Sequence, residues 1–343
     1  MRTPRLVVDR TVLDANLRRT AAWARDQGLD LRPHVKTHKS VDLARLQLDS
    51  GAVGITVATV GEAEVFVEAG FEDVFVAYPL WVDDERAERL RRLAGTTSRL
   101  AVGVDSVASA DRMTALPVDV LLEVDSGHHR TGVAPADVVP VAEHLLERVG
   151  DRLRGLFTFP GHSYFSPEAR HLAAHAEAAA LATARTALAA RDIHVPVLSG
   201  GSTPSLDAAD PGVLSEVRPG VYLFNDAQQW ELGTCSPDDI ALTCHATVVS
   251  HAGGRLVLDS GSKVLGADRA AYASGFGRPL DHAEARIVLL SEHHAVVEMP
   301  GRLPGLGSTV RVVPNHVCVA VNLVDTLWVD DEPWPVSARG RND

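Results

Sequence analysis

The sequence predicts an N-terminal (β/α)8 barrel of the TIM type, followed by a C-terminal all-β domain. Over about the first 230 residues, short apolar segments alternate with helix-like segments in about eight strand–helix pairs. After residue 236, strand-like segments follow one another with turns and little helix between them. No GxGxxG motif follows the first strand, which weakens the alternative of an open dinucleotide-binding sheet. The predicted domains are residues 1–235 and residues 236–343.

The elements of the predicted barrel follow from apolar spacing and from glycines that end helices, such as Gly51 and Gly70. The strand at residues 118–124 consists mostly of Val and Leu, which is typical of a strand covered on both faces. The predicted strands are residues 6–8, 31–35, 54–58, 73–78, 100–104, 118–124, 153–159, 195–198 and 213–217. The main predicted helices are residues 41–48, 60–69, 83–93, 106–113, 138–149 and 167–190.

The C-terminal domain is predicted from strand-like segments separated by turns such as residues 251–254 and 300–301. Its predicted strands are residues 241–250, 255–259, 285–290, 295–299, 309–313 and 317–321.

The composition is that of an ordinary soluble globular protein, with 45% apolar and 23% charged residues. A net charge of −12 argues against a nucleic-acid partner, because a basic face would have to outweigh it. The three cysteines form neither an even disulfide framework nor a CxxC motif, which favours a reducing, cytoplasmic setting. No apolar stretch approaches about 18 residues and residues 1–4 do not begin a signal peptide, so we expect no membrane partner.

Lys36 is the first candidate catalytic residue. It lies in the motif RPHVKTHK at residues 32–39, where the predicted strand 31–35 ends. The ends of barrel strands carry the chemistry in this architecture. Among cationic neighbours and low-dielectric walls an ammonium is disfavoured, so the amine becomes available as a nucleophile or Schiff-base partner. A basic surface loop is the alternative interpretation.

Two loops could bind a phosphate. In Ser199-Gly200-Gly201-Ser202-Thr203-Pro204-Ser205, consecutive glycines expose backbone N–H groups and the hydroxyls add donors. One strand later comes Arg218-Pro219-Gly220-Val221-Tyr222. Phosphates commonly bind after barrel strands seven and eight, which favours a site over two flexible turns.

Histidines and charged groups follow two further neighbouring strands. The motif DSGHHRTG at residues 125–132 closes a very apolar strand, and GHSY at residues 161–164 ends the next one. Charged groups at such positions are costly unless they are paired, which suggests a site. Isolated histidines, however, are usually structural.

The pair His316 and Cys318 could bind one metal ion, because residues two apart in a strand face the same side. A thiolate with an imidazole favours Zn²⁺ over Mg²⁺ or Mn²⁺. Two ligands would suit a catalytic ion with open positions for water and substrate. Taken alone, this spacing more often means a core cysteine beside an exposed histidine.

Together these motifs resemble the D-threonine aldolase and D-serine dehydratase-like family, whose barrel is of the alanine racemase type (fold-type III pyridoxal phosphate enzymes). The matching blocks are RPHVKTHK, DSGHHRTG, GHSY, SGGSTP, EVRPGVYLFND, LDSGSKVLGAD, SEHH and PNHVC, in family order over nearly the whole chain.

The resemblance implies pyridoxal phosphate held as a Schiff base on Lys36, with Arg130 near its phenolic oxygen and Arg218 near its pyridine nitrogen. It implies catalytic or ring-lining roles for His162 and Tyr164. The implied phosphate contacts are Gly200, Gly201, Ser202, Thr203, Gly220 and Tyr222. His316 and Cys318 would hold a divalent ion, Zn²⁺ or alternatively Mn²⁺ or Mg²⁺, that grips the substrate's β-hydroxyl.

The implied activity is that of a lyase on β-hydroxy-D-amino acids, acting as a homodimer. Cys318 favours dehydration over D-threonine-type aldol cleavage, because family aldolases tend to carry a carboxylate there. Val319-Ala320-Val321 departs from the family pattern, so the substrate pocket is expected to differ. An amino-acid racemase would have no use for the His–Cys pair. A non-catalytic pyridoxal phosphate carrier would lack the C-terminal domain.

Overall fold

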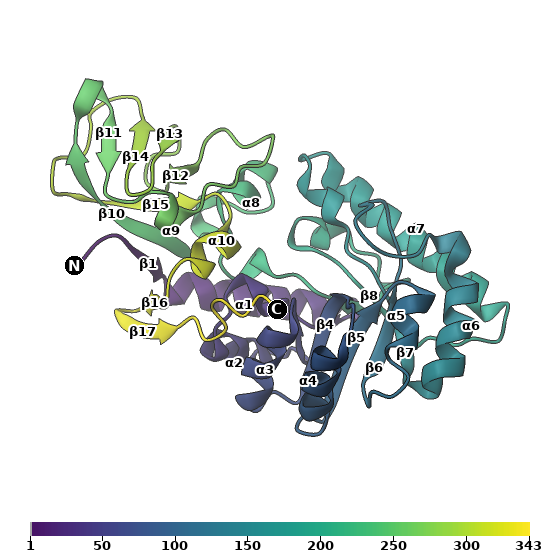
Figure 1. Ribbon diagram of the computed structural model, residues 1–343. Coiled ribbons are helices and arrows are strands. Elements are labelled where there is room, and N and C mark those ends of the chain that lie inside the picture. Colours follow the sequence, from purple (N-terminus) through teal and green to yellow (C-terminus); the bar gives the residue numbers. More distant parts are fainter. Residues whose placement is uncertain (1) are drawn as a thin grey trace. The chain divides into compact units, whose positions relative to one another are not determined.

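A computed structural model describes residues 2–343, and the chain forms two compact units that are discontinuous in sequence (Figure 1). The barrel unit comprises residues 20–36, 44–220 and 341–343, and the strand unit comprises residues 1–19, 37–43 and 221–340. The division of the sequence at residue 235 stays a prediction. Within residues 2–343, no helix has both the length and the apolar composition that crossing a membrane would require.

The barrel unit is built around eight parallel strands, as predicted. Their order in the sheet is β2 (Asp30–Leu31), β9 (Glu216–Val217), β8 (Val197–Gly200), β7 (Leu153–Phe157), β6 (Asp119–Glu123), β5 (Arg99–Val104), β4 (Asp73–Pro79) and β3 (Ile55–Val57). A parallel bridge between His34 and Thr56, with a hydrogen bond from Val53 N–H to Leu31 C=O, joins the two ends of this order. The sheet therefore closes on itself.

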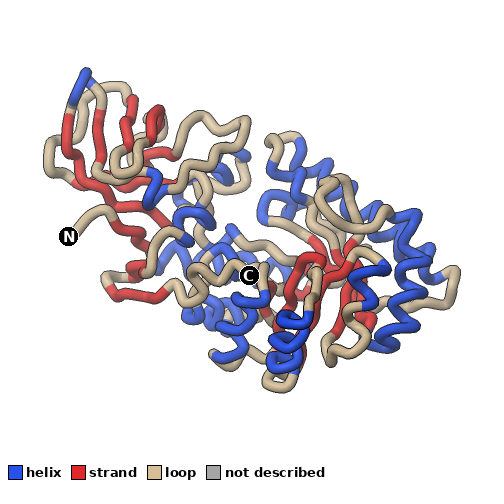
Figure 2. The backbone as a smooth tube through the Cα atoms, in the orientation of Figure 1, coloured by secondary structure: helices blue, strands red, loops and turns tan. Residues whose placement is uncertain are grey.

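Helices cover the outside of the barrel strands, as Figures 1 and 2 show for α4 to α7. They are α3 (Val60–Glu68), α4 (Asp84–Ala94), α5 (Val107–Asp111), α6 (Val138–Val149) and α7 (Ala169–Ala189), while α1 (Arg10–Gln27) and α2 (Val41–Asp49) contribute residues to both units. Inside the barrel, Phe75 and Phe157 pack edge to face with ring centres 5.2 Å apart. Such aromatic packing stabilises the barrel interior on which the site is built.

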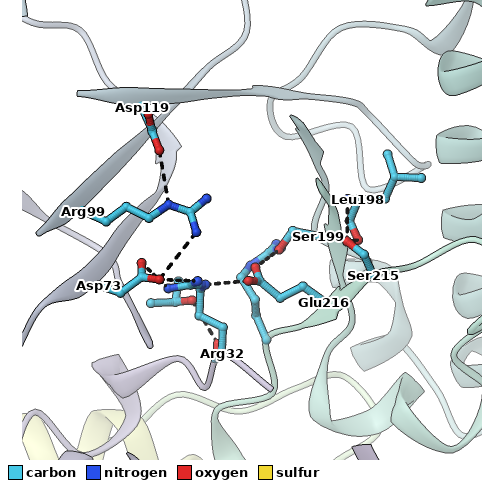
Figure 3. A network of polar contacts seen from close by, with 10 residues as sticks. Arg32, Asp73, Arg99, Asp119, Leu198, Ser199, Ser215 and Glu216 are labelled. Carbon is cyan, nitrogen blue, oxygen red and sulfur yellow. Dashed lines mark hydrogen bonds and ion pairs between the residues drawn. The ribbon is translucent and has the colours of Figure 1, made fainter. Parts of the chain in front are cut away.

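Charged side chains pair at the first residues of several barrel strands, in the network shown in Figure 3. Arg32 donates to Asp73 at 2.7 Å and to Glu216 at 2.6 Å. Arg99 continues the network, lying 3.5 Å from Asp73 and 3.2 Å from Asp119. The partners of Arg32 and the rest of the network begin strands β4, β5, β6 and β9, at the face of such barrels that serves stability rather than catalysis.

The strand unit is mostly strand. Its sheet runs in the order β13 (Arg286–Leu290), β14 (Ala295–Glu298), β11 (Leu256–Leu258), β10 (Leu242–Ser250), β1 (Arg5–Val8), β16 (Thr326–Val329) and β17 (Glu332–Pro335), with β15 (Thr309–Pro314) paired to β10 and to β12 (Gly277–Pro279). Its short helices are α8 (Ala227–Leu232), α9 (Ser262–Leu265) and α10 (Val317–Asn322). Strands β12, β16 and β17 were not predicted from the sequence.

Three local predictions are wrong. The segment 6–8 is not a barrel strand, because β1 pairs antiparallel with β10 and parallel with β16. The segment 317–321 is helix α10 rather than a strand. The strand predicted over residues 31–35 is too long, because β2 ends at Leu31 and Pro33 cannot donate to a strand ladder. Lys36 therefore lies in a 3-10 turn, Val35–Thr37, rather than directly at a strand end.

Candidate active site

Lys36 and two other predicted site residues, Arg130 and Tyr164, lie around the aromatic ring of Phe159. Its Nζ lies 5.5 Å from the centre of the Phe159 ring, and the guanidinium carbon of Arg130 lies 5.1 Å from the same centre. The Tyr164 ring is 6.4 Å from the Phe159 ring, centre to centre. Aromatic faces attract cations, and both positive groups lie within the range of such an interaction with Phe159. Phe159 ends the predicted strand 153–159 and lies outside every motif that predicts the site, so its role is not evident from the sequence.

His34 lies among three cations. Burial lowers the pKa of His34 well below its usual value, and the charges of Lys36, Arg218 and Arg130 lower it further. The imidazole is therefore neutral, and the positive charge of the site comes from the lysine and the two arginines. Pyridoxal phosphate carries an anionic phosphate and a phenolic oxygen, so the residues present fit this cofactor.

Arg218 is fixed inside the barrel. Its guanidinium carbon lies 5.7 Å from the centre of the Phe75 ring and 5.6 Å from that of Phe157. It donates to the Ser199 hydroxyl and to the Thr158 carbonyl. Ser199 in turn donates to a carboxylate oxygen of Glu216 at 2.5 Å. The orientation of Arg218 thus depends on the network of Figure 3, in which Ser199 and Glu216 are labelled.

The predicted phosphate loop, residues 199–205, follows the buried strand β8 and bends at Gly201, where φ is +77°. Gly201 N–H donates to the Glu177 carboxylate at 2.8 Å. Ser202 begins a 3-10 helix, Thr203–Ala208, and its hydroxyl lies 2.9 Å from that of Ser163. Hydroxyl groups and the start of a helical turn therefore gather at this loop, as anion binding requires.

The second predicted phosphate segment divides between the units. Gly220 belongs to the barrel unit, where the neighbouring Pro219 carbonyl accepts from His34 N–H at 3.0 Å. Tyr222 belongs to the strand unit and is buried in a 3-10 turn, Val221–Leu223.

The histidines at residues 128, 129 and 162 have different surroundings. His129 has an 81% exposed side chain and pairs with Asp125 at 2.7 Å, so it is a surface pair rather than a core group. His128 packs edge-on against Phe159 with ring centres 5.8 Å apart. Burial lowers the pKa of His128 and of His162, so both imidazoles are neutral at neutral pH.

The predicted metal pair lies in the strand unit. His316 has an extended backbone immediately before helix α10, and Cys318 lies in the first turn of that helix. His316 Nδ1 is 2.6 Å from a carboxylate oxygen of Asp268. Burial alone would lower the pKa of His316, but the charge of Cys318 and the hydrogen bond to Asp268 raise it to about 11. The two side chains therefore interact, although the strand geometry used to predict this was wrong.

The donor set fits one divalent ion with open positions. An imidazole whose other nitrogen bonds a carboxylate is typical of metal ligands, and Asp268 occupies that place. Cys318 Sγ lies 3.4 Å from the hydroxyl of Thr37, which follows Lys36 in the chain. Among residues 2–343, no group of three or more His, Cys, Asp or Glu side chains could hold a metal. Water or substrate would have to complete the coordination of the ion.

Two protein families match the chain. The family "Alanine racemase, N-terminal domain" matches residues 8–228, and the family "Putative serine dehydratase domain" matches residues 241–329. The chain is 35% identical to D-threo-3-hydroxyaspartate dehydratase from Delftia sp. (strain HT23) over 349 positions, with 92% of this chain and 90% of that protein covered. It is 34% identical to D-threonine aldolase from Arthrobacter sp. over 361 positions, with 98% and 93% covered.

A solved structure agrees over the whole length. D-threonine aldolase from Filomicrobium marinum superposes with a TM-score of 0.90 at 30% identity, and 99% of this chain and 95% of that one are covered. The fold, the site and these similarities define a pyridoxal phosphate-dependent lyase. The chain belongs to the D-threonine aldolase and D-serine dehydratase-like family, as its motifs predict.

Proposed function

We propose that the protein is a metal-dependent lyase that removes water from β-hydroxy-D-amino acids, in the manner of a D-serine dehydratase. The products would be a 2-oxo acid and ammonia. The observation that carries the proposal is the interacting His316–Cys318 pair, with Asp268 behind the imidazole, in a chain that also presents Lys36 among cations. Two relatives support the substrate class, since D-threo-3-hydroxyaspartate and D-threonine are both β-hydroxy-D-amino acids.

Lys36 has two tasks in this proposal. When bound, pyridoxal phosphate supplies an electron sink for cleavage of a bond at the substrate's Cα. The Lys36 amine anchors the cofactor and, once substrate has taken its place, removes the α-proton. Phe159 lies within 5.5 Å of the Lys36 amine and 5.1 Å of the Arg130 guanidinium carbon, measured from its ring centre, and so helps to position both groups.

The remaining barrel residues bind and orient. Arg218 faces the pyridine nitrogen in this proposal, where a permanent guanidinium charge keeps that nitrogen unprotonated. The other assignments are Arg130 for the phenolic oxygen, His162 and Tyr164 for the ring, and Gly200, Gly201, Ser202, Thr203, Gly220 and Tyr222 for the phosphate. Gly201 would contribute through the bend of the loop, because its N–H bonds Glu177.

His316 and Cys318 are proposed as ligands of a divalent ion. When bound, such an ion supplies Lewis acidity that makes a β-hydroxyl a better leaving group. We favour Zn²⁺ over Mn²⁺ or Mg²⁺ because the set contains a thiol. The hydrogen bond between His316 Nδ1 and Asp268 leaves Nε2 for the ion. In support of a metal, one solved structure is a cysteine-to-alanine variant of a D-threo-3-hydroxyaspartate dehydratase in the metal-free form, which implies that this relative also has a metal-bound form.

Aldol cleavage to glycine and an aldehyde is the second candidate. The similarity to D-threonine aldolases favours it, and so does 29% identity to 3-hydroxy-D-aspartate aldolase from Paracoccus denitrificans (strain Pd 1222), with 99% of this chain covered. The same lysine and metal pair would serve, with the ion acidifying the hydroxyl instead of assisting its departure.

We further propose that the protein is a cytoplasmic homodimer and that its small-molecule substrate is a D-amino acid. Support for the compartment comes from Cys235, Cys244 and Cys318, none of which forms a disulfide within residues 2–343.

The test is product analysis with purified holoenzyme on D-serine, D-threonine and D-threo-3-hydroxyaspartate, with and without Zn²⁺ after chelation. A 2-oxo acid with ammonia supports dehydration, whereas glycine with an aldehyde establishes the aldolase. Full turnover after exhaustive chelation would refute the metal role. Interconversion of enantiomers without a carbonyl product would indicate a racemase.

A further inference from the structure

Glu177 is a buried carboxyl group that the proposed chemistry does not use. It lies in the middle of helix α7, and its side chain is fully buried. Its Oε1 accepts a hydrogen bond from Gly201 N–H at 2.8 Å. Its Oε2 has no hydrogen-bond partner among residues 2–343. A buried carboxyl group with one oxygen unsatisfied is costly, so it is expected to serve a purpose.

The carboxyl group shapes the phosphate loop from behind. A Cβ at Gly200 would lie 2.4 Å from Glu177 Oε1 and 2.8 Å from its Cδ, so no side chain fits there. Gly201 has a φ of +77°, which also favours glycine. Glu177 therefore explains one glycine of the pair and bonds the N–H of the other.

Few charges act on this carboxyl group. Burial raises the pKa of Glu177 to about 7, opposed by the hydrogen bond from Gly201 and by the charge of Arg218. The titratable groups on the elements packed against α7 are Asp137, Glu143, His144, Glu147, Arg148, His162, Tyr164 and Asp207. Unlike the charge of Arg218, none of these groups is among the causes that shift the pKa of Glu177. Asp207 is paired with Arg170 at 2.8 Å.

We propose that Glu177 is a positioning residue for the cofactor phosphate, holding the loop from behind and taking up one proton from solvent when the phosphate binds. A phosphate monoester carries a charge of roughly −1.5 to −2 at neutral pH. A carboxylate bonded to the same loop would repel it through a low-dielectric interior, whereas a neutral carboxylic acid would not. The inference rests on the proposed assignment of residues 200–203 to the phosphate.

The test compares pyridoxal phosphate with pyridoxal, which lacks the phosphate. Full-length protein freed of cofactor is titrated with each compound at pH values from one unit below to two units above the pKa of about 7. The ratio of the two affinities removes any pH effect on the Lys36 amine, which both compounds share. In the wild type this ratio should fall with rising pH, approaching about tenfold per pH unit above the pKa. In Glu177→Gln, which keeps the shape and cannot ionise, it should stay level above about pH 7, where the phosphate has already lost its second proton.

Two controls separate a positioning role from a structural one. Glu168→Gln changes an exposed carboxylate at the start of α7 and should behave like the wild type. In the wild type above the pKa of Glu177, calorimetry in buffers of different ionisation enthalpy should detect more proton uptake with pyridoxal phosphate than with pyridoxal, by up to one proton, even if Glu177→Gln fails to fold.

The outcomes are distinguishable. Parallel pH profiles in the wild type and Glu177→Gln, or equal proton uptake with pyridoxal phosphate and with pyridoxal, would overturn the inference and leave the proposed function standing. Failure of the wild type to bind pyridoxal phosphate, or equal affinity for both compounds at every pH, would overturn the phosphate assignment and the inference with it.

Discussion

Glu216→Gln should destabilise the protein through the network of Figure 3. The Glu216 carboxylate accepts from Arg32 Nε at 2.6 Å and from the Ser199 hydroxyl at 2.5 Å, and the Arg32 and Glu216 side chains are only 5% and 7% exposed. Removing one charge of a buried pair typically costs about 3–5 kcal/mol, because the other charge is left uncompensated. Arg32 keeps its two hydrogen bonds to Asp73, at 2.7 and 2.9 Å. We therefore expect the lower end, about 3 kcal/mol.

For a chain of 343 residues, that loss corresponds to a thermal unfolding midpoint lowered by roughly 4 °C. Asp73→Asn should cost less, because Asp73 is 24% exposed and solvent screens part of the lost charge. The control is Glu88→Gln, since Glu88 lies 3.4 Å from Arg91 on the exposed face of α4 and such pairs contribute about 0–1 kcal/mol.

The measurement is differential scanning calorimetry of the three variants and the wild type, each with bound cofactor. The expectation is refuted if Glu216→Gln and Glu88→Gln have the same unfolding midpoint, or if Asp73→Asn has the lowest midpoint of the three variants. Because Ser199 also bonds Arg218, Glu216→Gln should in addition change the absorption spectrum of the bound cofactor, and Asp73→Asn should not.

Three further predictions concern the cofactor, the metal and pH. Lys36→Ala should be colourless and release added pyridoxal phosphate on dialysis, while the wild type is yellow; a borohydride-stable adduct on another residue would contradict the assignment of Lys36. Asp268→Asn should lower Zn²⁺ affinity by about 10- to 100-fold in competition with a chromogenic chelator, and unchanged affinity would argue against an orienting role. Glu177 has a pKa of about 7 in the folded chain against an ordinary 4.5, so the folded state binds more protons between these values and stability falls as pH rises through them. In urea unfolding of cofactor-free protein, the free energy of unfolding of the wild type should fall by roughly 3 kcal/mol over this pH range, and Glu177→Gln should abolish the fall. If the two proteins differ in free energy of unfolding by the same amount at both ends of the range, the prediction is contradicted.

The barrel could be predicted because its strands and helices repeat one local pattern. The predicted helix 138–149 is α6 (Val138–Val149), whose apolar spacing and following Gly150 mark both ends. Strand β1 (Arg5–Val8) could not be assigned in the same way. Its four residues alternate between buried and partly buried positions, and nothing in them specifies which sheet supplies the hydrogen bonds. Pairing with residues 242–245 is set by tertiary contacts far along the chain.

For the His316–Cys318 pair, the two side chains interact as predicted, but the predicted local structure is wrong. Residues 317–321 read Val-Cys-Val-Ala-Val, and β-branched residues favour a strand. The segment is helical because Asp226, at the start of α8, accepts from Val317 N–H at 3.1 Å and so satisfies a donor in its first turn. The two side chains still interact, since an extended residue before a helix and one in its first turn point to the same end.

The neutral state of His34 lay beyond sequence reasoning, although the motif RPHVKTHK contains it. His34 and Lys36 are two basic residues of one motif, and their types alone suggest similar roles in a cationic cluster. Burial and the fields of Lys36, Arg218 and Arg130 lower the pKa of the imidazole, and two of those charges come from residues more than 90 positions away. The site therefore offers three positive charges and one neutral ring. Two variants test which property of His34 matters. If His34→Gln, which is also neutral, leaves cofactor affinity unchanged while His34→Lys reduces folding or binding, the imidazole is needed for its neutrality and size. If His34→Gln loses affinity, the imidazole instead makes a direct contact with the cofactor.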